Sequence, residues 1–355
     1  MFVKSLYLRH FRNYSETEIH FSPRLNLFYG ENAQGKTNLL EAISLIATGR
    51  SFRTTRLQEL IQEGSSFFFI EAKIIKNAFE HIVAITFDGQ AKKLTLDGNS
   101  YSTLQHLLGL VPSVFFTPSD AELADGSPAV RRRFLNVHLA QRDPLYIHHL
   151  SRYWRAMKQR NALLRSVDLS AIACWEQEMA ESASYLWKMR AHLLSEIQAP
   201  LQENAVFLSG GRESYEIRGH FAPQESYATQ LQKNRPREKQ LGMTLTGPHR
   251  DDFSLLINGK SSGTFGSEGQ KKSVAFGLRL AEWGLFTKSC EAPALLCIDD
   301  LGVHLDSMRR ALFSKSLEQL GQVFVTAPDV GDNFVDAKRF LITAGAVLHE
   351  DVTSL

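Results

Sequence analysis

Eight residues near the start of the chain constrain its fold more strongly than any other segment. They follow the P-loop pattern, in which two glycines separated by four residues precede a lysine and a hydroxyl residue. The eight are Gly30, Glu31, Asn32, Ala33, Gln34, Gly35, Lys36 and Thr37. Residues 25–29 suit a buried strand, and residues 37–43 suit a helix. A strand, a glycine-rich turn and a helix N-terminus form a phosphate site, so the segment predicts an α/β fold that binds a nucleoside triphosphate.

The residues of this pattern have separate chemical tasks. Glycine at positions 30 and 35 lets the backbone turn its N–H groups toward phosphate oxygens. Lys36 is expected to reach the β- and γ-phosphates, and the Thr37 hydroxyl is expected to bind Mg²⁺. The expected ligands are therefore a nucleoside triphosphate and Mg²⁺.

The composition is that of a globular protein without a membrane span. Of the 355 residues, 43% are hydrophobic, which is enough for a full core. No apolar run approaches the roughly 20 residues that a membrane helix needs, and charges interrupt the first ten residues, unlike in a signal peptide. The three cysteines, Cys174, Cys290 and Cys297, lack the spacing of a metal site. We therefore expect a cytoplasmic protein with no membrane partner.

Positive charge is concentrated in one segment, although the net charge of the chain is only +2. Residues 131–165 contain nine Lys or Arg and one acid, Asp143. A run of one sign suits a polyanion such as a nucleic-acid backbone, whereas a solvated helix face normally mixes both signs. A solvated face stays open as the alternative, and at most two of three successive arginines on a helix can face one partner. The candidate DNA contacts are Arg131, Arg132, Arg133, Arg152, Arg155 and Lys158.

The order of predicted elements suggests a discontinuous nucleotide-binding head. Residues 1–125 and 210–355 mix strands and helices, and continuous apolar runs at 294–298 and 323–325 indicate a sheet that is covered on both faces. Short strands at 67–75, 80–87 and 92–96 suggest an antiparallel patch beside that sheet. The predicted fold class is α/β, with a mixed sheet, an antiparallel β patch and an inserted helical lobe.

The inserted lobe, residues 126–209, carries two apolar series with the coiled-coil period. The first series is Ile147, Leu150, Trp154, Met157 and Leu164, with Asn161 at its polar position. The second series is Ile172, Trp175, Met179, Leu186, Met189 and Leu193, with Ser182 at its polar position. A polar turn at 165–170 separates them, so the lobe is expected to hold a short antiparallel coiled-coil arm. The periodicity allows this arm either to protrude or to pack flat.

A second acidic motif would complete an ATPase site. Residues 295–300 form a buried strand that ends in two carboxylates, the Walker B pattern. Asp299 is placed to hold Mg²⁺, and Asp300 is placed to activate the attacking water as the catalytic base. The alternative is a strand followed by an Asp-capped helix.

Residues 267–270 resemble the signature motif of ABC-type ATPases. In that superfamily the motif binds the γ-phosphate held by a second subunit, and Leu305 with Asp306 resembles the D-loop at the same interface. The residues carried over to nucleotide binding are Ser267, Gly269, Gln270 and Asp306. A serine-capped helix is the alternative. The wide separation of Lys36 from Asp299, with a helical lobe between them, groups the chain with SMC-like ATPases that have a short arm.

Further motifs make the chain resemble the RecF family of bacterial recombination and gap-repair ATPases over essentially its whole length. These motifs occupy residues 11–14, 30–37, 49–54, 126–128 with 131–135, 246–252, 267–270 and 295–300. The resemblance implies an ATP- and Mg²⁺-dependent DNA-binding protein of repair, recombination, replication restart and the SOS response to DNA damage. It implies that Arg12 and Asn13 contact the nucleotide, and that the chain forms a homodimer on ATP.

The resemblance also implies partners and a weak, DNA-stimulated ATPase activity that acts as a switch. The partners would be single- and double-stranded DNA at gaps, together with RecO and RecR, which help to load RecA. The chain departs from the family pattern at Ser119, Val303 and Pro328, and no switch histidine is evident. Two alternatives therefore stay open, namely a transporter ATPase subunit and an ATP-sensing scaffold that hydrolyses almost nothing.

Overall fold

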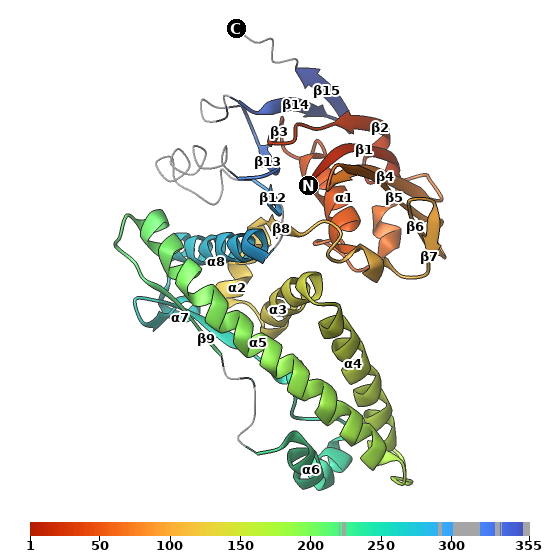
Figure 1. Cartoon of the computed structure of the whole chain (residues 1–355), viewed down its shortest axis with the longest axis vertical. Helices are drawn as coiled ribbons and strands as arrows, with labels where there is room; N and C mark the ends of the chain where they lie inside the picture. The colour runs from red at the N-terminus through yellow and green to blue at the C-terminus, as the bar shows by residue number, and fades with distance from the viewer. Residues whose placement is uncertain are drawn as a thin grey trace. The chain divides into compact units, whose positions relative to one another are not determined.

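The computed structural model describes residues 1–219, 221, 225–289, 293–300, 320–330, 334 and 336–350 (Figure 1). The chain divides into two compact units. Unit 1 is Met1–Asp120 with Arg279–Leu355, and unit 2 is Ala121–Leu278. Within the described part of the chain, no helix combines the length and the apolar character needed to cross a membrane.

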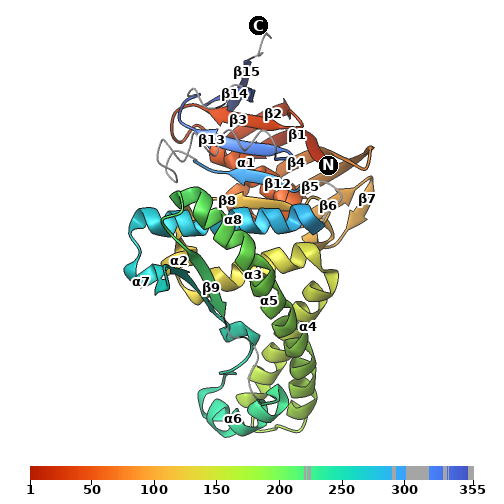
Figure 2. The same cartoon turned by 60° about the vertical axis from the view of Figure 1, so that its left-hand side comes forward.

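Unit 1 contains a mainly parallel six-stranded sheet in the order β15-β14-β3-β13-β12-β8. Its strands are β3 (Leu25–Tyr29), β8 (Ser113–Phe116), β12 (Leu295–Ile298), β13 (Val323–Ala327), β14 (Lys338–Thr343) and β15 (Ala346–Glu350), of which only β15 runs antiparallel to its neighbour. Figure 2 shows these strands one above another. Every residue of β3, β12 and β13 is buried, as expected for strands covered on both faces.

The predicted antiparallel patch is a second six-stranded sheet of unit 1, in the order β2-β1-β4-β5-β6-β7. Its strands are β1 (Phe2–Phe11), β2 (Tyr14–His20), β4 (Phe68–Lys76), β5 (Phe79–Phe87), β6 (Lys92–Leu96) and β7 (Asn99–Tyr101). Burial alternates along β4, so one face of this sheet meets the core. Short helical turns η1 (Leu57–Leu60), η2 (Leu104–Leu107) and η3 (Pro118–Ala121) connect the elements.

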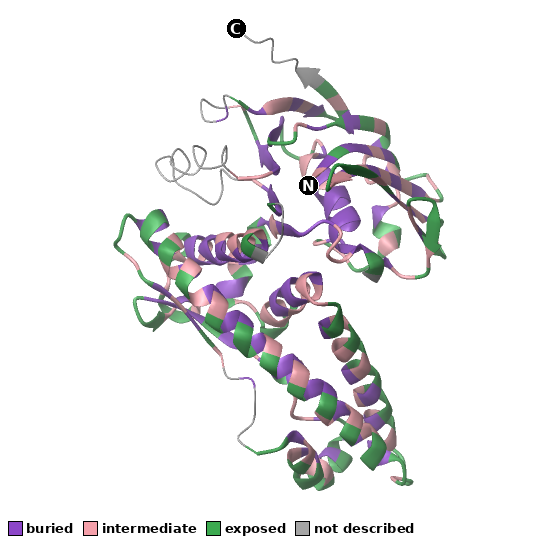
Figure 3. Ribbon diagram, viewed as in Figure 1, coloured by how far each residue is buried: buried purple, intermediate pink, exposed green. Residues whose placement is uncertain are grey.

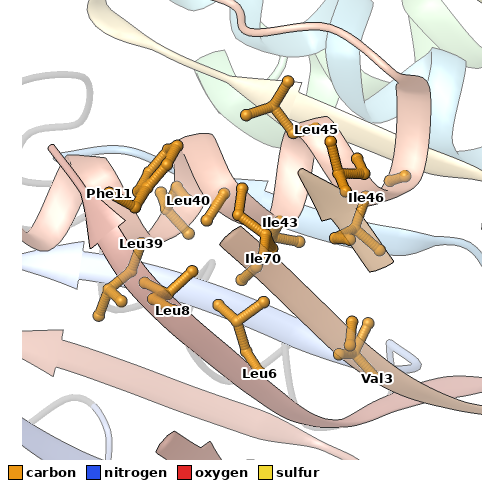
Figure 4. Close-up of a cluster of buried hydrophobic side chains, with 14 of the residues drawn as sticks. Val3, Leu6, Leu8, Phe11, Leu39, Leu40, Ile43, Leu45, Ile46 and Ile70 are labelled. Atoms are coloured by element: carbon orange, nitrogen blue, oxygen red, sulfur yellow. The ribbon is translucent and has the colours of Figure 1, made fainter. Parts of the chain in front are cut away.

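Helix α1 (Lys36–Thr48) joins the two sheets of unit 1 through one apolar core. Its side chains pack on β1 and β4, as Figure 4 shows for Leu6, Phe11, Leu39, Ile43 and Ile70. The same cluster includes Phe28, Cys297, Phe324 and Phe340 of the parallel sheet. The helix that follows the P-loop is therefore held by residues from most of the unit.

Unit 2 is mainly helical and contains one small sheet. Its elements are α2 (Glu122–Asp125), α3 (Pro128–Arg142), α4 (Pro144–Leu164), α5 (Ile172–Ser209), β9 (Tyr215–Gly219), α6 (Tyr227–Leu241), η4 (Pro248–Arg250), β10 (Phe253–Ile257), β11 (Lys260–Ser261), α7 (Ser262–Phe265) and the first half of α8 (Glu268–Ser289). The sheet order is β11-β10-β9. Figures 1 and 2 show α4 and α5 side by side as a hairpin.

Residues 210–278 pack on the helices, although the sequence prediction placed them with the head. The reason is a side-chain ladder from α5 to β9. Gln198 accepts from the Ile217 N–H and donates to the Tyr215 carbonyl, while Gln202 accepts from the Tyr215 N–H. These bonds join the first strand of the small sheet to the long helix. The predicted division of the chain, with residues 126–209 alone as the helical lobe and its short arm, stays a prediction.

The buried seam of α5 differs from the predicted one at two positions, and on α4 only one of the five predicted apolar residues is buried. The buried series on α5 is Ile172, Glu176, Met179, Ala183, Leu186, Arg190, Leu193 and Ile197, which alternates steps of four and three (Figure 3). Glu176 and Arg190 occupy places that the apolar count gave to Trp175 and Met189. On α4 the buried residues are Tyr146, Tyr153, Ala156, Arg160 and Leu164, so only Leu164 was predicted, and the predicted core residue Trp154 is 46% exposed. Counting apolar residues alone failed because the seam contains paired charges.

Two buried arginines tie the hairpin to the rest of unit 2. Arg160 contacts Glu176 of α5 and Glu238 of α6 at 3.0 and 2.7 Å. Arg190 donates to the Asp251 carboxylate and, at 2.7 Å, to the Pro248 carbonyl. Burying a charge is costly unless it is paired and hydrogen-bonded, so these contacts constrain how the helices can pack.

Residues 246–252 fit between the hairpin and α6. The Tyr153 hydroxyl contacts Nδ1 of His249 at 2.7 Å, and the Tyr227 hydroxyl donates to the Thr246 carbonyl at 2.6 Å. Burial lowers the pKa of His249 to about 4, so its ring is neutral at physiological pH. Gly247 has φ 132°, and a Cβ there would lie 2.2 Å from the Tyr227 hydroxyl.

Replacing Gly247 by Ala is expected to destabilise the chain by about 3 kcal/mol, because the new methyl combines backbone strain with a clash against two buried tyrosines. Thermal unfolding followed by circular dichroism measures the change. Gly284→Ala in α8 is the control, since a Cβ there meets nothing within 4 Å and alanine favours a helix. Equal midpoints for the two variants would contradict the packing described for Gly247.

Candidate functional site

The P-loop connects β3 to α1, and its backbone accepts hydrogen bonds from Asn13, in the turn between β1 and β2, and from Tyr14, the first residue of β2. Gly35 has φ 121°, and a Cβ there would lie 2.7 Å from the Asn13 amide and 2.8 Å from the Tyr14 hydroxyl. The Tyr14 hydroxyl donates to the Gly35 carbonyl at 3.0 Å. Only glycine fits this close approach, so the loop keeps its N–H groups available for a ligand.

Lys36 lies over the loop and donates to its carbonyls. The ammonium contacts the Gly30 carbonyl at 2.5 Å and the Glu31 carbonyl at 2.6 Å. Desolvation lowers the pKa of Lys36, against the opposing effect of the Asp299 and Asp300 carboxylates. Helix α1 begins at Lys36, and no side chain caps its N-terminus. A cation and uncapped N–H groups at one place form a site for phosphate.

Asp299 lies far from this loop in the sequence but contacts it in the fold. Thr37 donates to its two carboxylate oxygens at 2.8 and 3.1 Å, across 262 residues of sequence. Thr326, at the end of β13, donates to the same carboxylate at 2.9 Å. Asp299 is only 6% exposed, and burial raises its pKa. Burial therefore disfavours the ionised carboxylate, and a bound cation would stabilise it.

The donor set at this point fits Mg²⁺. A hydroxyl and a carboxylate are hard oxygen donors, and Mg²⁺ in triphosphate sites usually takes one or two protein ligands with the phosphates supplying others. Among the described residues no group of three or more His, Cys, Asp or Glu could hold a metal by itself. The sequence prediction that Thr37 and Asp299 share a metal is consistent with their contact.

Asp300 follows Asp299 in a left-handed backbone conformation, with φ 56°. Its N–H donates to the Thr326 hydroxyl at 2.7 Å, so one threonine links both acids. Such strain in a non-glycine residue is common at functional sites. The sequence prediction had assigned no role to Thr326. Its place at the end of a strand next to Walker B is the signal that could have identified it.

Arg12 and Asn13 support the loop and its helix. The Arg12 guanidinium makes two hydrogen bonds of 2.8 Å to Glu41, and Glu41 is fully buried on α1. Asn13 donates to the Gln34 carbonyl and accepts from Asn38, both at 2.8 Å. Their predicted contact with the nucleotide stays a prediction, because these side chains already have partners.

Glu41 is the buried residue that the sequence prediction missed. It also accepts from the Ser51 hydroxyl at 2.5 Å and lies 3.5 Å from the Arg53 guanidinium. A lone glutamate among the apolar residues 39–47 is the signal that could have found it, together with the basic segment 49–54. The cluster stabilises the helix on which the phosphate site depends.

A cleft of about 680 Å³ lies beside the P-loop, at the carboxyl ends of β3, β13 and β14. It is lined by Tyr29, Gly30, Glu31, Gln34, residues 328–330 and residues 341–343. Ligands of α/β sheets bind at the carboxyl ends of the strands, so the cleft lies where a nucleotide is expected. Glu31 and Gln34 of the predicted loop line it, while Asn32 and Ala33 lie between them in sequence.

The signature segment belongs to unit 2 and caps α8. The Ser267 N–H donates to the Gln270 side chain at 3.0 Å, and the Gln270 N–H donates to the Ser267 hydroxyl at 3.3 Å, which is a capping box. Packing does not require the glycine at 269, since a Cβ there would meet nothing within 4 Å. The helix-cap alternative therefore explains Ser267 but leaves Gly269 unexplained. Leu305 and Asp306 lie outside the described residues.

Most of the basic stretch is paired within unit 2. Arg131 contacts Asp252 at 2.6 Å, and Arg132 donates to the Asp251 carbonyl at 3.0 Å. On the hairpin, Arg152 and Arg155 contact glutamates of α5 at 2.9 and 2.7 Å. Arg133, Arg155 and Lys158 are exposed. DNA contact by the six candidates stays a prediction, but the excess of charge in the sequence is largely balanced by carboxylates from other segments.

Comparison with known proteins places this site in a family. The model of the RecF/RecN/SMC N-terminal domain matches residues 2–331. A protein of Protochlamydia amoebophila named DNA replication and repair protein RecF is 42% identical over 339 residues, which is 93% of this chain and 94% of the relative.

Two solved structures also match. One is titled as the recombination mediator protein RecF with ATP in the RecFOR pathway, with TM-score 0.91, 27% identity and coverage of 98% of this chain and 97% of that one. The other is an Smc head domain of Pyrococcus furiosus, with TM-score 0.59, 14% identity and coverage of 98% and 96%. The second likeness concerns the fold alone and agrees with the predicted ABC-type head.

The raised pKa of Asp299 leads to a prediction about stability and pH. A carboxyl whose folded pKa lies above its unfolded value of about 4 destabilises the chain as it ionises, so the cost is absent at lower pH and grows as pH rises toward neutrality. Without nucleotide, Asp299→Asn should unfold at pH 7 at or above the wild-type temperature and depend less on pH.

The same variant should lose the stabilisation that Mg²⁺ and ATP give the wild type. That stabilisation is about 2.7 kcal/mol when the ligand is at 100 times its dissociation constant. Calorimetric unfolding at pH 4.5 and 7, with and without Mg²⁺ and ATP, measures both effects. A full ligand shift in Asp299→Asn would show that Asp299 does not hold the metal.

Proposed function

The chain belongs to the RecF family of DNA replication and repair proteins, and we propose that it acts in recombinational repair as an ATP-dependent clamp on DNA. The observation that carries the proposal is the contact of Thr37 with Asp299 beside an uncapped helix N-terminus. This arrangement suits one triphosphate with its metal. The alternative of a transporter subunit is set aside, because a family member 42% identical to this chain is named a repair protein.

The chain binds ATP, and the geometry suggests how binding changes the loop. Lys36 now donates to the carbonyls of Gly30 and Glu31, and phosphate oxygens would replace those carbonyls as its partners. Mg²⁺ would be held by Thr37 and Asp299 and would neutralise charge on the phosphates. Binding would thus relieve the two costs of the free site, a desolvated lysine and a buried carboxylate.

The ATP-bound form is a homodimer in this proposal. Ser267 and Gly269 lie at the N-terminus of α8, a helix of 22 residues, and the free space around Gly269 would admit a γ-phosphate held by a second copy. Gln270 is held by Glu213 at 2.9 Å, which keeps the segment in place, and Asp306 would lie at the same interface. Two copies would then enclose two ATP molecules.

Hydrolysis would open the dimer. Asp300 is the proposed base, and Thr326 fixes its backbone. Loss of the γ-phosphate removes the charge-assisted bonds to Ser267 and Gly269 of the other copy. The activity would be a slow switch rather than metabolic turnover. A scaffold that senses ATP without hydrolysing it is the second candidate, favoured by Pro328 directly after β13, where the chain departs from the family pattern.

DNA and other repair proteins complete the proposal. The chain would bind single- and double-stranded DNA at gaps, and its partners would be RecO and RecR, which load RecA. The relative solved with ATP is described as a mediator of the RecFOR pathway. Arg133, Arg155 and Lys158 are the candidates for phosphate contact among the six that are exposed.

Lys36→Ala and Ser267→Arg should each abolish dimerisation on ATP, the first by removing a phosphate ligand and the second by blocking the opposite face of the site. Sedimentation velocity with and without ATP gives the measurement. Ser226→Arg is a matched control, since Ser226 also caps a helix, α6, but lies outside the proposed site. Asp300→Asn should still dimerise while its turnover falls about 100-fold.

A normal ATP-induced dimer in both Lys36→Ala and Ser267→Arg would rule out the two-copy site. Unchanged turnover in Asp300→Asn would remove Asp300 from the role of base. Absence of turnover in the wild type, with dimerisation intact, would favour the scaffold.

DNA affinity should fall steeply with salt, because backbone contacts release counterions. Arg133→Gln and Lys158→Gln should each weaken binding regardless of sequence and reduce the salt slope by about one. Fluorescence anisotropy of a labelled gapped duplex with ATP measures the slope, and Lys260→Gln, at an exposed lysine of β11, is the control. An affinity independent of salt would contradict phosphate contact.

A further inference from the structure

The turn between α4 and α5 exposes an apolar side chain where polar residues are usual. Val167 is 96% exposed, the highest value for a large hydrophobic residue in the described part of the chain. Its neighbours in the turn are Arg165, Ser166 and Asp168. Turns favour Gly, Pro, Asn, Asp and Ser for conformational reasons, and none of these reasons applies to valine.

Two further apolar residues gather near this turn from the end of α6. Leu241 is 54% exposed and Met243 is 40% exposed. The Arg165 side chain donates to the Gly242 carbonyl at 3.0 Å, and the Thr244 N–H donates to Asn161 of α4 at 2.8 Å. The end of α6 is therefore fixed against the end of α4.

A cavity of about 480 Å³ lies at this junction. It is lined by residues 164–167 from the α4 end and by residues 239–242 from the α6 end. We call the tip surface this cavity together with Arg165, Val167, Leu241 and Met243. Exposed apolar groups around a hollow, with a polar rim, are typical of protein-docking sites.

The rim of the tip surface is positive. Arg165 and Lys239 line the cavity and are both exposed, and Lys239 lies in the last turn of α6. The neighbouring Glu238 is buried and paired with Arg160, so it does not balance them. The one exposed acid in the turn, Asp168, accepts from the Ser170 N–H at 2.8 Å. An acidic partner would complement this rim.

We propose that the tip surface docks an acidic segment of another protein, which inserts an apolar side chain into the cavity beside Val167 and Leu241. DNA fits less well for two reasons. Helices α4 and α6 both end here, and their C-terminal carbonyls repel phosphate. The three exposed apolar side chains also cannot donate hydrogen bonds to a phosphate backbone. The inference does not depend on the phosphate loop or on Asp299, which lie in unit 1.

The test is selection of random 12-residue peptides, displayed on phage, on the full-length protein. Peptides that combine acidic residues with a Leu, Ile or Phe anchor should be enriched. A synthetic labelled copy of the strongest should bind, and Val167→Ser and Leu241→Ser should each weaken it about tenfold. Both side chains are exposed, so these variants keep the fold, and the neutral substitution leaves the charge unchanged.

Matched controls separate the tip surface from general stickiness and from nucleotide binding. Phe79→Ser, at a residue 71% exposed in unit 1, should leave peptide affinity unchanged. Arg165→Gln with Lys239→Gln should weaken binding and reduce its salt dependence. Lys36→Ala should bind the peptide as the wild type does, even though its ATP-induced dimer is lost.

Three results would overturn the proposal. The first is that no acidic, apolar peptide is enriched, or that those enriched bind Val167→Ser and Leu241→Ser normally. The second is that both variants bind a labelled 30-base-pair duplex at least tenfold more weakly, which would make the tip surface a DNA contact. The third is that both variants lose self-association in sedimentation without ATP, which would make a second copy the occupant.

Discussion

The hydrogen bonds from the Thr37 hydroxyl to the Asp299 carboxylate join two segments that lie 262 residues apart. They form because β3 and β12 both pair in parallel with β13, which brings the ends of all three strands to one edge of the sheet. The phosphate loop, the Walker B acids, Thr326 and the cleft all lie at that edge. Since burial raises the pKa of Asp299, the site without ligand holds a carboxylate that a cation would stabilise.

Buried charges organise unit 2 in a comparable way. Arg160 and Arg190 lie on the helical hairpin and are paired with Glu176 of the hairpin itself and with Glu238 and Asp251 from two other segments. Such pairs add little net stability, because desolvation offsets their attraction, but an alternative packing would leave a charge unpaired. The segment 246–252 is therefore held against the hairpin by ion pairs and hydrogen bonds, which a purely apolar core would lack. Some of the arginines that the sequence suggested as DNA contacts instead form ion pairs within unit 2.

The sequence predicted the two motifs of the nucleotide site, the antiparallel patch and the helical insertion, since each is a contiguous pattern. It was wrong about four of the five apolar seam residues of α4 and about Trp175 and Met189 of α5, because an apolar count passes over buried Tyr, Arg and Glu. It missed Glu41 and gave Thr326 no role, since their importance comes from partners on other strands and loops. The cavity between the ends of α4 and α6 left no pattern in the sequence either.

By itself the sequence determined the phosphate loop, because its glycines, lysine and helix N-terminus are adjacent residues whose local geometry already forms an anion site. It also determined the family, through motifs distributed over the chain. Only the tertiary structure decided which charges are exposed to a partner. Arg131 is balanced by Asp252, 121 residues away, and Arg152 by Glu181, 29 residues away. Charges interact through space, so their balance depends on which segments the fold brings together.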